Sequence, residues 1–265
     1  MRSNVQFIAL SIGLTFGINA NAALTLHSPL EGIFLKNPTE ITYQAKGLQF
    51  STAASITLSA PNYAQTAWWY KYNGGLLRQV LTTPPPNNTW VTATLRDGPA
   101  TSSRRYRTAF PWTIPSSIGV AAASSQYASF PKGYCTNFAS RAFHAGPSIN
   151  VSYIPWSGNA KDWIVNADRA GWRTTSSTTE GAIGAVAVWR GGGFGHVGVV
   201  VDMNRTAVAG EIEYTINEMN WGALIDPVNA ITKNFGKVSS LKLKSSSMGR
   251  SAAYPFVGFV LPQRK

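Results

Sequence analysis

Four side chains in this sequence have the types and spacing that nucleophilic catalysis needs. Cys135 is the only cysteine, and His196 follows the glycine-rich stretch 190–195. Glu218 and Asn220 lie two residues apart at the end of an alternating apolar run. An imidazole beside a thiol can generate a thiolate, and a carboxylate or amide can orient the imidazole. The sequence therefore predicts a nucleophilic site in which either Glu218 or Asn220 orients His196.

The start of the chain bears on the role of the single cysteine. Arg2 precedes the apolar stretch 5–18, and residues 20–22 read Ala-Asn-Ala, the pattern of an export signal with its cleavage site. We expect a secreted or periplasmic protein beginning near Ala23, with no later transmembrane segment. A single thiol in an oxidising compartment has no internal disulfide partner, which favours a chemical role over that of a small buried hydrophobe.

The residues around Cys135 predict a helix. Tyr134, Phe138 and Ala142, with Phe143 alongside, follow helical spacing and would form one apolar stripe facing a core. Cys135 then lies in the first helical turn. Free backbone N–H groups and the positive end of the helix dipole favour a thiolate there.

Among the three histidines, His196 is the candidate partner of the thiol. His27 falls in the first half of the chain, and His144 follows Cys135 by nine residues, far along the same helix. Residues 184–189 and 196–201 predict two strands joined by the turn 190–195. His196 would then head a strand at the rim of a sheet, where functional sites are often built.

A third predicted strand, residues 212–220, supplies the polar partner. Ile212, Tyr214, Ile216, Glu218 and Asn220 share one side of it because alternate residues of a strand face the same way. Polar groups on an inward face require hydrogen-bond partners, and an imidazole N–H from the adjacent strand would serve.

The first half of the chain has a different pattern, and we divide the chain into a signal (1–22), an all-β module (23–115) and a catalytic domain (116–265). Short extended runs alternate with turn formers, which indicates a small sandwich-like fold. The extended runs are 40–43, 55–58, 68–72 and 89–95, and the turns are 73–75, 84–88 and 97–99. Residues 112–124 read as the connection to the second module. The aromatic run 68–72 either forms a binding face or fills a core.

The composition is that of a globular protein, and the net charge limits the classes of binding partner that we expect. The chain is 44% apolar and 13% charged, with a net charge of +12, which favours anionic envelope polymers. It contains no basic helix with interleaved aromatic residues, so nucleic acid is not expected. Residues 232–265 carry seven basic residues and no acid. These residues either dock the protein on an anionic polymer or protect a sheet edge.

Five segments in order resemble the CHAP family, the cysteine- and histidine-dependent amidohydrolases and peptidases of the papain-like (NlpC/P60) superfamily. The segments, within residues 123–261, are PKGYCTNFASRAF, GNAKDW, GAIGAVAVW, GHVGVV and INEMNWG. The resemblance implies an α+β domain with a cysteine-bearing helix packed on an antiparallel sheet. It implies Cys135 as nucleophile, His196 as general base and then acid, Glu218 as the orienting residue and Asn220 as a supporting polar group.

The sequence also departs from the family pattern. Tyr134 stands where many members have Gln, and Asn137-Phe138 replaces an aromatic pair; we expect both changes at the rim of the site. Since no Asp-x-Asp loop of the calcium-binding type lies near Cys135, we expect no metal and no cofactor.

The resemblance implies an activity that cleaves amide bonds in peptidoglycan, as an N-acetylmuramoyl-L-alanine amidase or an endopeptidase, in wall remodelling or antibacterial attack. Two alternatives stay open. One is a silent module that binds wall or a protein through the first half of the chain, and the other is a cysteine amidase for a non-wall amide. Tryptophans 156, 163, 172, 189 and 221 are expected to fill the core more than to line a groove.

Overall fold

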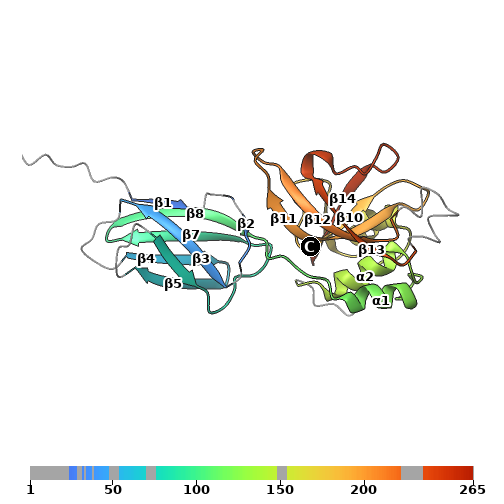
Figure 1. Cartoon of the computed structure of the whole chain (residues 1–265), viewed down its shortest axis with the longest axis horizontal. Helices are drawn as coiled ribbons and strands as arrows, with labels where there is room; N and C mark the ends of the chain where they lie inside the picture. Colours follow the sequence, from blue (N-terminus) through green and yellow to red (C-terminus); the bar gives the residue numbers. More distant parts are fainter. Residues whose placement is uncertain are drawn as a thin grey trace, which may run out of the picture.

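The computed structural model describes residues 24–28, 32, 34–37, 39–47, 54–69, 76–147, 154–221 and 235–264. The predicted signal 1–22 and the predicted turn 73–75 lie outside these residues, as does most of the aromatic run 68–72. The described chain forms two bodies side by side, an N-terminal body of strands and a C-terminal body in which helices cover a sheet (Figure 1). No helix among the described residues is long and apolar enough to cross a membrane.

Two sheets make up the N-terminal body. One has the order β1-β3-β6 and contains β1 (Thr25–Ser28), β3 (Glu40–Lys46) and β6 (Leu76–Val80). The other has the order β2-β8-β7-β4-β5 and contains β2 (Phe34–Leu35), β8 (Ala100–Thr108), β7 (Trp90–Asp97), β4 (Ala54–Ala60) and β5 (Tyr63–Trp69). The side chains of Tyr43, Ile56 and Tyr106 meet between the sheets in one buried cluster. The two sheets thus form a sandwich.

Local sequence explains these strands. Burial alternates along β4, where Ala54, Ile56 and Leu58 face the core and the intervening residues are only half-buried. The tight connections use residues that tolerate a left-handed backbone: Asn62 (φ 59°) joins β4 to β5, and Gly98 (φ 59°) joins β7 to β8.

The C-terminal body is an α+β fold with one six-stranded antiparallel sheet. Its strand order is β13-β12-β11-β10-β14-β9, with β13 (Val238–Lys244), β12 (Ile212–Met219), β11 (His196–Arg205), β10 (Val186–Trp189), β14 (Phe256–Arg264) and β9 (Trp172–Thr175). Among the described residues three α-helices accompany it, α1 (Ser116–Ser124), α2 (Cys135–Ala145) and α3 (Trp163–Arg169), with short 3₁₀ turns η1 (Ala160–Asp162) and η2 (Ser245–Ser247). Helix α2 packs on β11 and β12, and α3 packs on β9 and β14.

Helix α1 corrects a sequence prediction, because residues 112–124 were expected to be a connection. Ile114, Ile118 and Ala122 recur every four residues, which is helical spacing, and they pack against Phe138 and Met219. The abundance of Pro, Ser and small residues hid this short apolar stripe.

The basic C-terminal stretch is mostly part of the sheet. Its predicted closing strand is β14, which lies inside the sheet between β10 and β9. One edge of the sheet is β13, where Lys242 pairs with Glu213 and Lys244 with Glu211 (3.2 and 3.4 Å). The structure therefore favours the edge-protecting interpretation for these two lysines.

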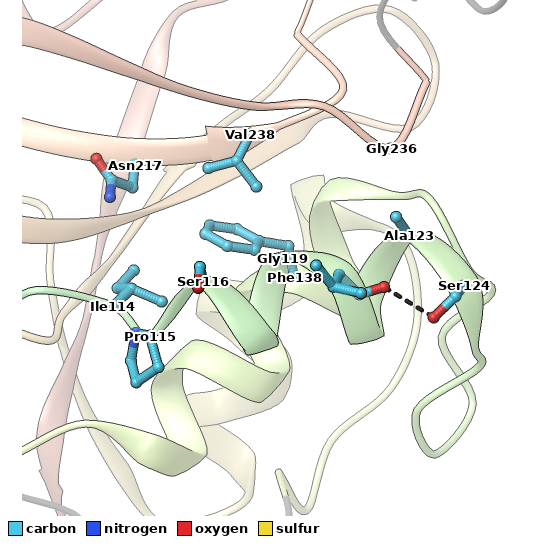
Figure 2. Close-up of a pocket in the computed structure, with 11 residues that line it drawn as sticks. Ile114, Pro115, Ser116, Gly119, Ala123, Ser124, Phe138, Asn217, Gly236 and Val238 are labelled. Atoms are coloured by element: carbon cyan, nitrogen blue, oxygen red, sulfur yellow. Dashed lines mark hydrogen bonds between the residues drawn. The ribbon is translucent and has the colours of Figure 1, made fainter.

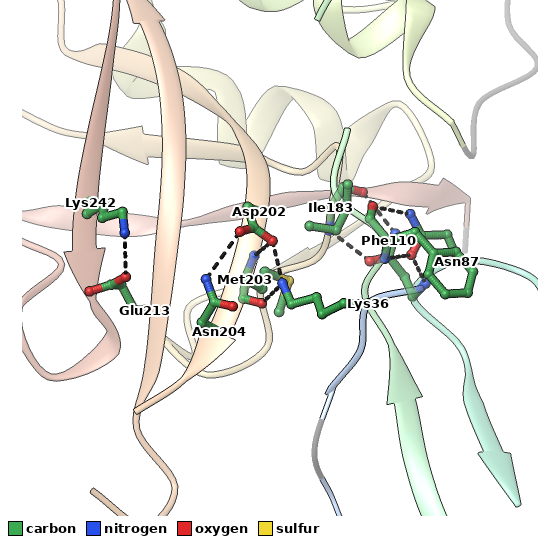
Figure 3. Close-up of polar contacts among 10 residues, drawn as sticks. Lys36, Asn87, Phe110, Ile183, Asp202, Met203, Asn204, Glu213 and Lys242 are labelled. Carbon is green, nitrogen blue, oxygen red and sulfur yellow. Dashed lines mark hydrogen bonds and ion pairs between the residues drawn. The ribbon is translucent and has the colours of Figure 1, made fainter. Parts of the chain in front are cut away.

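A dense junction joins the two bodies (Figure 3). Asn88 clamps the backbone of Ile183: its Oδ1 accepts from the Ile183 N–H (2.7 Å) and its Nδ2 donates to the Ile183 carbonyl (2.9 Å). Lys36 pairs with Asp202, and Phe34 shares a buried cluster with residues of the C-terminal sheet. The N-terminal sandwich is thus packed against the C-terminal sheet.

Candidate active site

Cys135 is the first residue of α2 and is 9% exposed. Tyr134 caps the helix in an extended conformation (ψ 154°) without a side-chain cap, so the N–H groups of the first turn have no partner inside the helix. Asn137 holds the preceding loop against the helix, because its Nδ2 donates to the carbonyls of Ser125, Phe130 and Pro131 (2.9, 2.9 and 3.1 Å). The thiol therefore lies on a fixed helix start.

His196 begins β11 directly opposite Trp189 of β10. The turn before it depends on glycine: Gly195 has φ 76°, and a Cβ there would lie 2.5 Å from the Lys161 backbone nitrogen and 2.7 Å from the Trp189 carbonyl oxygen. Only glycine allows this close backbone approach. The predicted strand–turn–strand unit is present and places the imidazole at the sheet rim.

Glu218 is the side chain that binds the imidazole. Its Oε2 lies 3.0 Å from His196 Nε2, and the two side chains are 2% and 1% exposed. Gly198, opposite Glu218 on β11, leaves room for the side chain of Ile216 and for the Cβ of Glu218. Because Nε2 faces Glu218, Nδ1 remains for Cys135, which lines the same cavity and lies close enough to raise the pKa of the ring.

The electrostatics favour a charged imidazole. Burial works against the charge, but the Cys135 sulfur and then the Glu218 carboxylate outweigh it and raise the pKa of His196 to about 9. At neutral pH the ring can therefore hold the proton that it takes from the thiol. This arrangement allows proton exchange between sulfur and ring.

Asn220 takes a place other than the predicted one. Strand β12 ends at Met219, and Asn220 has a left-handed backbone (φ 66°), so it no longer continues the alternating face of the strand. Its Oδ1 is buried and has no hydrogen-bond partner among the described residues. Of the two candidates for orienting His196, Glu218 makes the contact, and Asn220 lines the cavity beside it.

A cavity of about 540 Å³ opens over the cysteine and the histidine. Its lining residues come from the loop before α2, from segment 157–160 and from the start of β11: Ser129, Phe130, Pro131, Tyr134, Cys135, Thr136, Ser157, Gly158, Asn159, Ala160, Phe194, Gly195, His196 and Asn220.

Two predictions about the Cys135 helix need correction. Tyr134 is at the rim as expected, but it is exposed and does not join the apolar stripe, since it lies before the helix in extended backbone. Asn137 and Phe138 are buried and belong to the support of the helix, so the departures from the family pattern there do not alter the rim.

A second hollow of about 620 Å³ lies between α1 and β13 (Figure 2). Phe138, Asn217 and Val238 contribute to its lining, and none of the four predicted site residues does. It is thus separate from the candidate site.

The tryptophans mostly fill the core, as expected. Trp156, Trp163, Trp172 and Trp189 are buried. Trp221 instead packs edge-on against His196, with 4.9 Å between ring centroids, and carries the Arg250 guanidinium 3.7 Å above its ring.

Arg250 is the site residue that sequence reasoning missed. Its Nη1 donates to Glu218 Oε2 at 3.0 Å, the same oxygen that faces His196. The other histidines lie elsewhere: His144 Nδ1 lies 2.7 Å from the Tyr127 hydroxyl, and His27 is on β1. No local signal marks Arg250, because it contacts a residue 32 positions away. Among the described residues, no cluster of three or more His, Cys, Asp or Glu could hold a metal ion.

The α+β body brings a cysteine at the start of a helix and a histidine at the start of a strand to one cavity. Residues 125–220 match the family model of the CHAP domain. The chain therefore carries a domain of the CHAP family, which implies a hydrolase of the amidase or peptidase type.

Proposed function

We propose that this protein is an exported cysteine hydrolase that cleaves amide bonds in peptidoglycan, as an N-acetylmuramoyl-L-alanine amidase or as an endopeptidase. One observation carries the proposal: a single buried imidazole hydrogen-bonds the Glu218 carboxylate and lines the same cavity as the Cys135 thiol. The cavity over Cys135 and His196 is large enough for the peptide part of such a substrate.

The residues define a sequence of bond changes. His196 takes the proton of Cys135, and the sulfur attacks the amide carbonyl carbon. The backbone N–H of Cys135 at the helix start donates to the resulting oxyanion. His196 returns the proton to the leaving amine as the C–N bond breaks, which leaves a thioester. Water, deprotonated by His196, then releases the carboxylic acid and restores the thiol.

In this mechanism Glu218 orients the ring and stabilises its positive charge. Asn220, whose buried Oδ1 lacks a partner among the described residues and whose side chain lines the cavity, would bind a polar atom of the substrate. A buried acceptor of this kind favours a ligand that donates a hydrogen bond, such as an amide N–H.

Digestion of purified sacculi followed by mass spectrometry tests this function and identifies the bond. New free amino groups on alanine, together with peptide-free glycan, would identify an amidase, and cuts within the peptides an endopeptidase. If wild-type protein releases no fragment from sacculi, the proposed substrate is wrong.

The outward face of the sheet β2-β8-β7-β4-β5 supports a second role, binding of the wall polymer by the N-terminal body. Cross-strand registers place Trp68, Ser55 and Arg96 in one row of this face. Further rows follow on the same side, Thr66-Thr57-Thr94-Ser103, Ala64-Ser59-Thr92-Arg105 and Trp90-Arg107. Hydroxyl groups thus fill the middle of the face between two tryptophans.

The chemistry of this face suits an anionic glycan. Trp68 and Trp90 are 54% and 45% exposed, and exposed indole rings stack on sugar rings. Arg105 lies over the Trp90 ring, and Arg96 is exposed. Among the described residues this face carries no acid, because Asp97 is buried and Glu40 lies in the other sheet. A polysaccharide with carboxylate groups would find both stacking and counter-charge here.

Polymer binding at this face would take place far from the candidate active site. His196 begins β11 and Arg205 ends it, and Arg205 contacts Gly32 and Phe34 of the N-terminal body. Nine residue steps of a strand span about 30 Å. The face would therefore anchor the enzyme on its polymer without touching the scissile bond.

Co-sedimentation with sacculi tests this anchoring in the Cys135→Ala background, where no digestion interferes. We expect Trp68→Ala combined with Trp90→Ala to weaken binding about tenfold or more. The matched control is Val80→Ala, an exposed apolar residue of the other sheet, which should bind normally. Equal binding by all three proteins would contradict the glycan assignment. So would a loss of binding that a protein partner reverses and sacculi do not.

A further inference from the structure

Arg250 occupies a position that the proposed mechanism does not use. It lies between η2 and β14, and its Nη1 and the His196 Nε2 both lie 3.0 Å from Glu218 Oε2. The remaining oxygen, Oε1, accepts from Ser239 Oγ at 3.4 Å. The carboxylate is thus held on three sides, by β11, by β13 and by the Arg250 loop.

The Arg250 loop is itself anchored to the sheet. Trp189 Nε1 donates to the Met248 carbonyl (2.7 Å), and the Arg250 N–H donates to the Tyr254 carbonyl (3.1 Å). The guanidinium lies 3.7 Å over the Trp221 ring, and Trp221 packs edge-on against His196. Arg250 is only 10% exposed at its side chain, so its contact with Glu218 is well protected from water.

We propose that Arg250 is a positioning residue, which gives Glu218 a permanent counter-charge and holds it correctly oriented throughout the reaction cycle. The proposal rests on the proposed function only in treating Cys135 and His196 as the reactive pair. Arg250 acts on His196 through the carboxylate that they share, and it touches neither the substrate nor the sulfur.

Charge balance through the cycle gives the reason. While His196 holds the thiol proton, the negative sulfur, positive imidazole, negative carboxylate and positive guanidinium sum to zero. Once His196 has passed its proton to the leaving amine, the imidazole is neutral and the thioester is uncharged. Glu218 would then be a buried carboxylate without a counter-charge, which is costly. Arginine stays charged at every accessible pH, so it covers this state.

The other groups around the site do not supply that charge. The side chains of Ser239 on β13, Trp189 and Trp221 are neutral. Cys135 at the start of α2 carries no positive charge in any state. Burial and then the nearby Cys135 raise the pKa of Tyr254, so its hydroxyl stays neutral. Among the described groups packed around Glu218, Arg250 is the permanent cation.

The test measures the rate at which iodoacetamide alkylates Cys135 as a function of pH, which needs no substrate. In Arg250→Gln, which keeps a donor and removes the charge, we expect the acidic limb of the profile to move up by about 1 pH unit or more. The alkylation rate at pH 6 should fall roughly tenfold, because Glu218 without its counter-charge is no longer held against the imidazolium and stabilises it less. Arg250→Lys should restore most of the wild-type profile.

Two controls separate positioning from a structural role. Arg173→Gln on edge strand β9 removes an exposed arginine that binds a neutral partner, Gln263, and should leave the profile unchanged. In a Glu218→Gln background, Arg250→Gln should have no further effect on the profile. If Arg250→Gln alone fails to fold because the Glu218 carboxylate is left unpaired, the double variant removes that charge as well.

A folded Arg250→Gln protein with the wild-type acidic limb would overturn the proposal. So would additive effects of Arg250→Gln and Glu218→Gln. Failure of the proposed function is distinguishable, since it would show as normal alkylation without release of sacculus fragments.

Discussion

His196 Nε2 lies 3.0 Å from Glu218 Oε2, and both side chains are almost completely buried. The contact joins neighbouring strands β11 and β12 at the end of the sheet where α2 begins with Cys135. The imidazole therefore cannot rotate without breaking a buried ion pair. Its other nitrogen stays available to Cys135, which lines the same cavity, and proton transfer needs such a free nitrogen.

Substitution of the nucleophile should abolish hydrolysis without unfolding the protein. We expect Cys135→Ala to lower the rate of sacculus clearing by about 10³-fold or more, with a thermal midpoint close to wild type. His196→Ala should be nearly as severe, and the double variant no worse than either, because the two residues act as one unit. Clearing by Cys135→Ala at the wild-type rate would remove Cys135 from the mechanism.

The raised pKa of His196 predicts how stability depends on pH. The value is about 9 in the folded protein against an ordinary 6.5, so the folded state binds the proton more tightly than the unfolded chain. This contribution to stability is fully present below pH 6.5 and is lost as pH rises through 9. Urea unfolding between pH 6 and pH 10 measures it.

In Glu218→Gln the pKa of His196 should fall, because one of the groups that raise it is removed. The stability loss should therefore be smaller than in the wild type and should end at a lower pH, because it runs only from 6.5 to the folded pKa. Superimposable curves for the two proteins would show that Glu218 does not stabilise the imidazolium.

Two glycines of the turn before His196 form a matched pair. Gly193 and Gly195 share φ 76°, but a Cβ at Gly193 meets nothing within 4 Å, whereas one at Gly195 meets backbone at 2.5 Å. Gly193→Ala should cost about 1 kcal/mol through backbone strain alone. Gly195→Ala should cost about 2 kcal/mol more and displace His196, with a roughly tenfold or larger loss of activity. Chemical denaturation and sacculus clearing measure both effects, and equal behaviour of the two variants would refute the clash.

The Asn88 clamp should stabilise the junction between the two bodies. Asn88→Ala leaves the Ile183 N–H and carbonyl without their partners, and we expect a loss of about 2–4 kcal/mol. Asn166→Ala, which removes one exposed hydrogen bond to Ser157, is the control and should cost about 1 kcal/mol or less. Alkylation of Cys135 should be unchanged below the melting range, since the clamp lies far from the site. A melting curve like that of the control would show that Asn88 does not hold the junction.

Short-range patterns predicted the elements that carry the site. The strand–turn–strand around residues 190–195 and the alternation along β12 depend on residues that are neighbours in the chain, so the sequence alone predicts them. The helix start at Cys135 followed from the spacing of Phe138 and Ala142. Helix α1 was missed because its apolar stripe is short and lies among residues typical of loops.

Long-range contacts could not be predicted from the sequence alone. Arg250 meets Glu218 only because η2 and β14 return the chain to the end of β12, and no spacing rule encodes that return. Asn220 left its predicted strand face because one left-handed residue ends the alternation. The direction of the backbone at the end of β12 likewise determines that Glu218, and not Asn220, is the partner of His196.

The sequence by itself was enough to predict a nucleophilic site, since it contains one thiol, one suitably placed histidine and two polar strand-end residues. Only the tertiary structure decided which polar group holds the imidazole and which cation balances it. The physical reason is that residue type and local periodicity are set by neighbours in the chain, whereas ion pairs among buried groups depend on distances of a few ångströms between segments far apart in the chain.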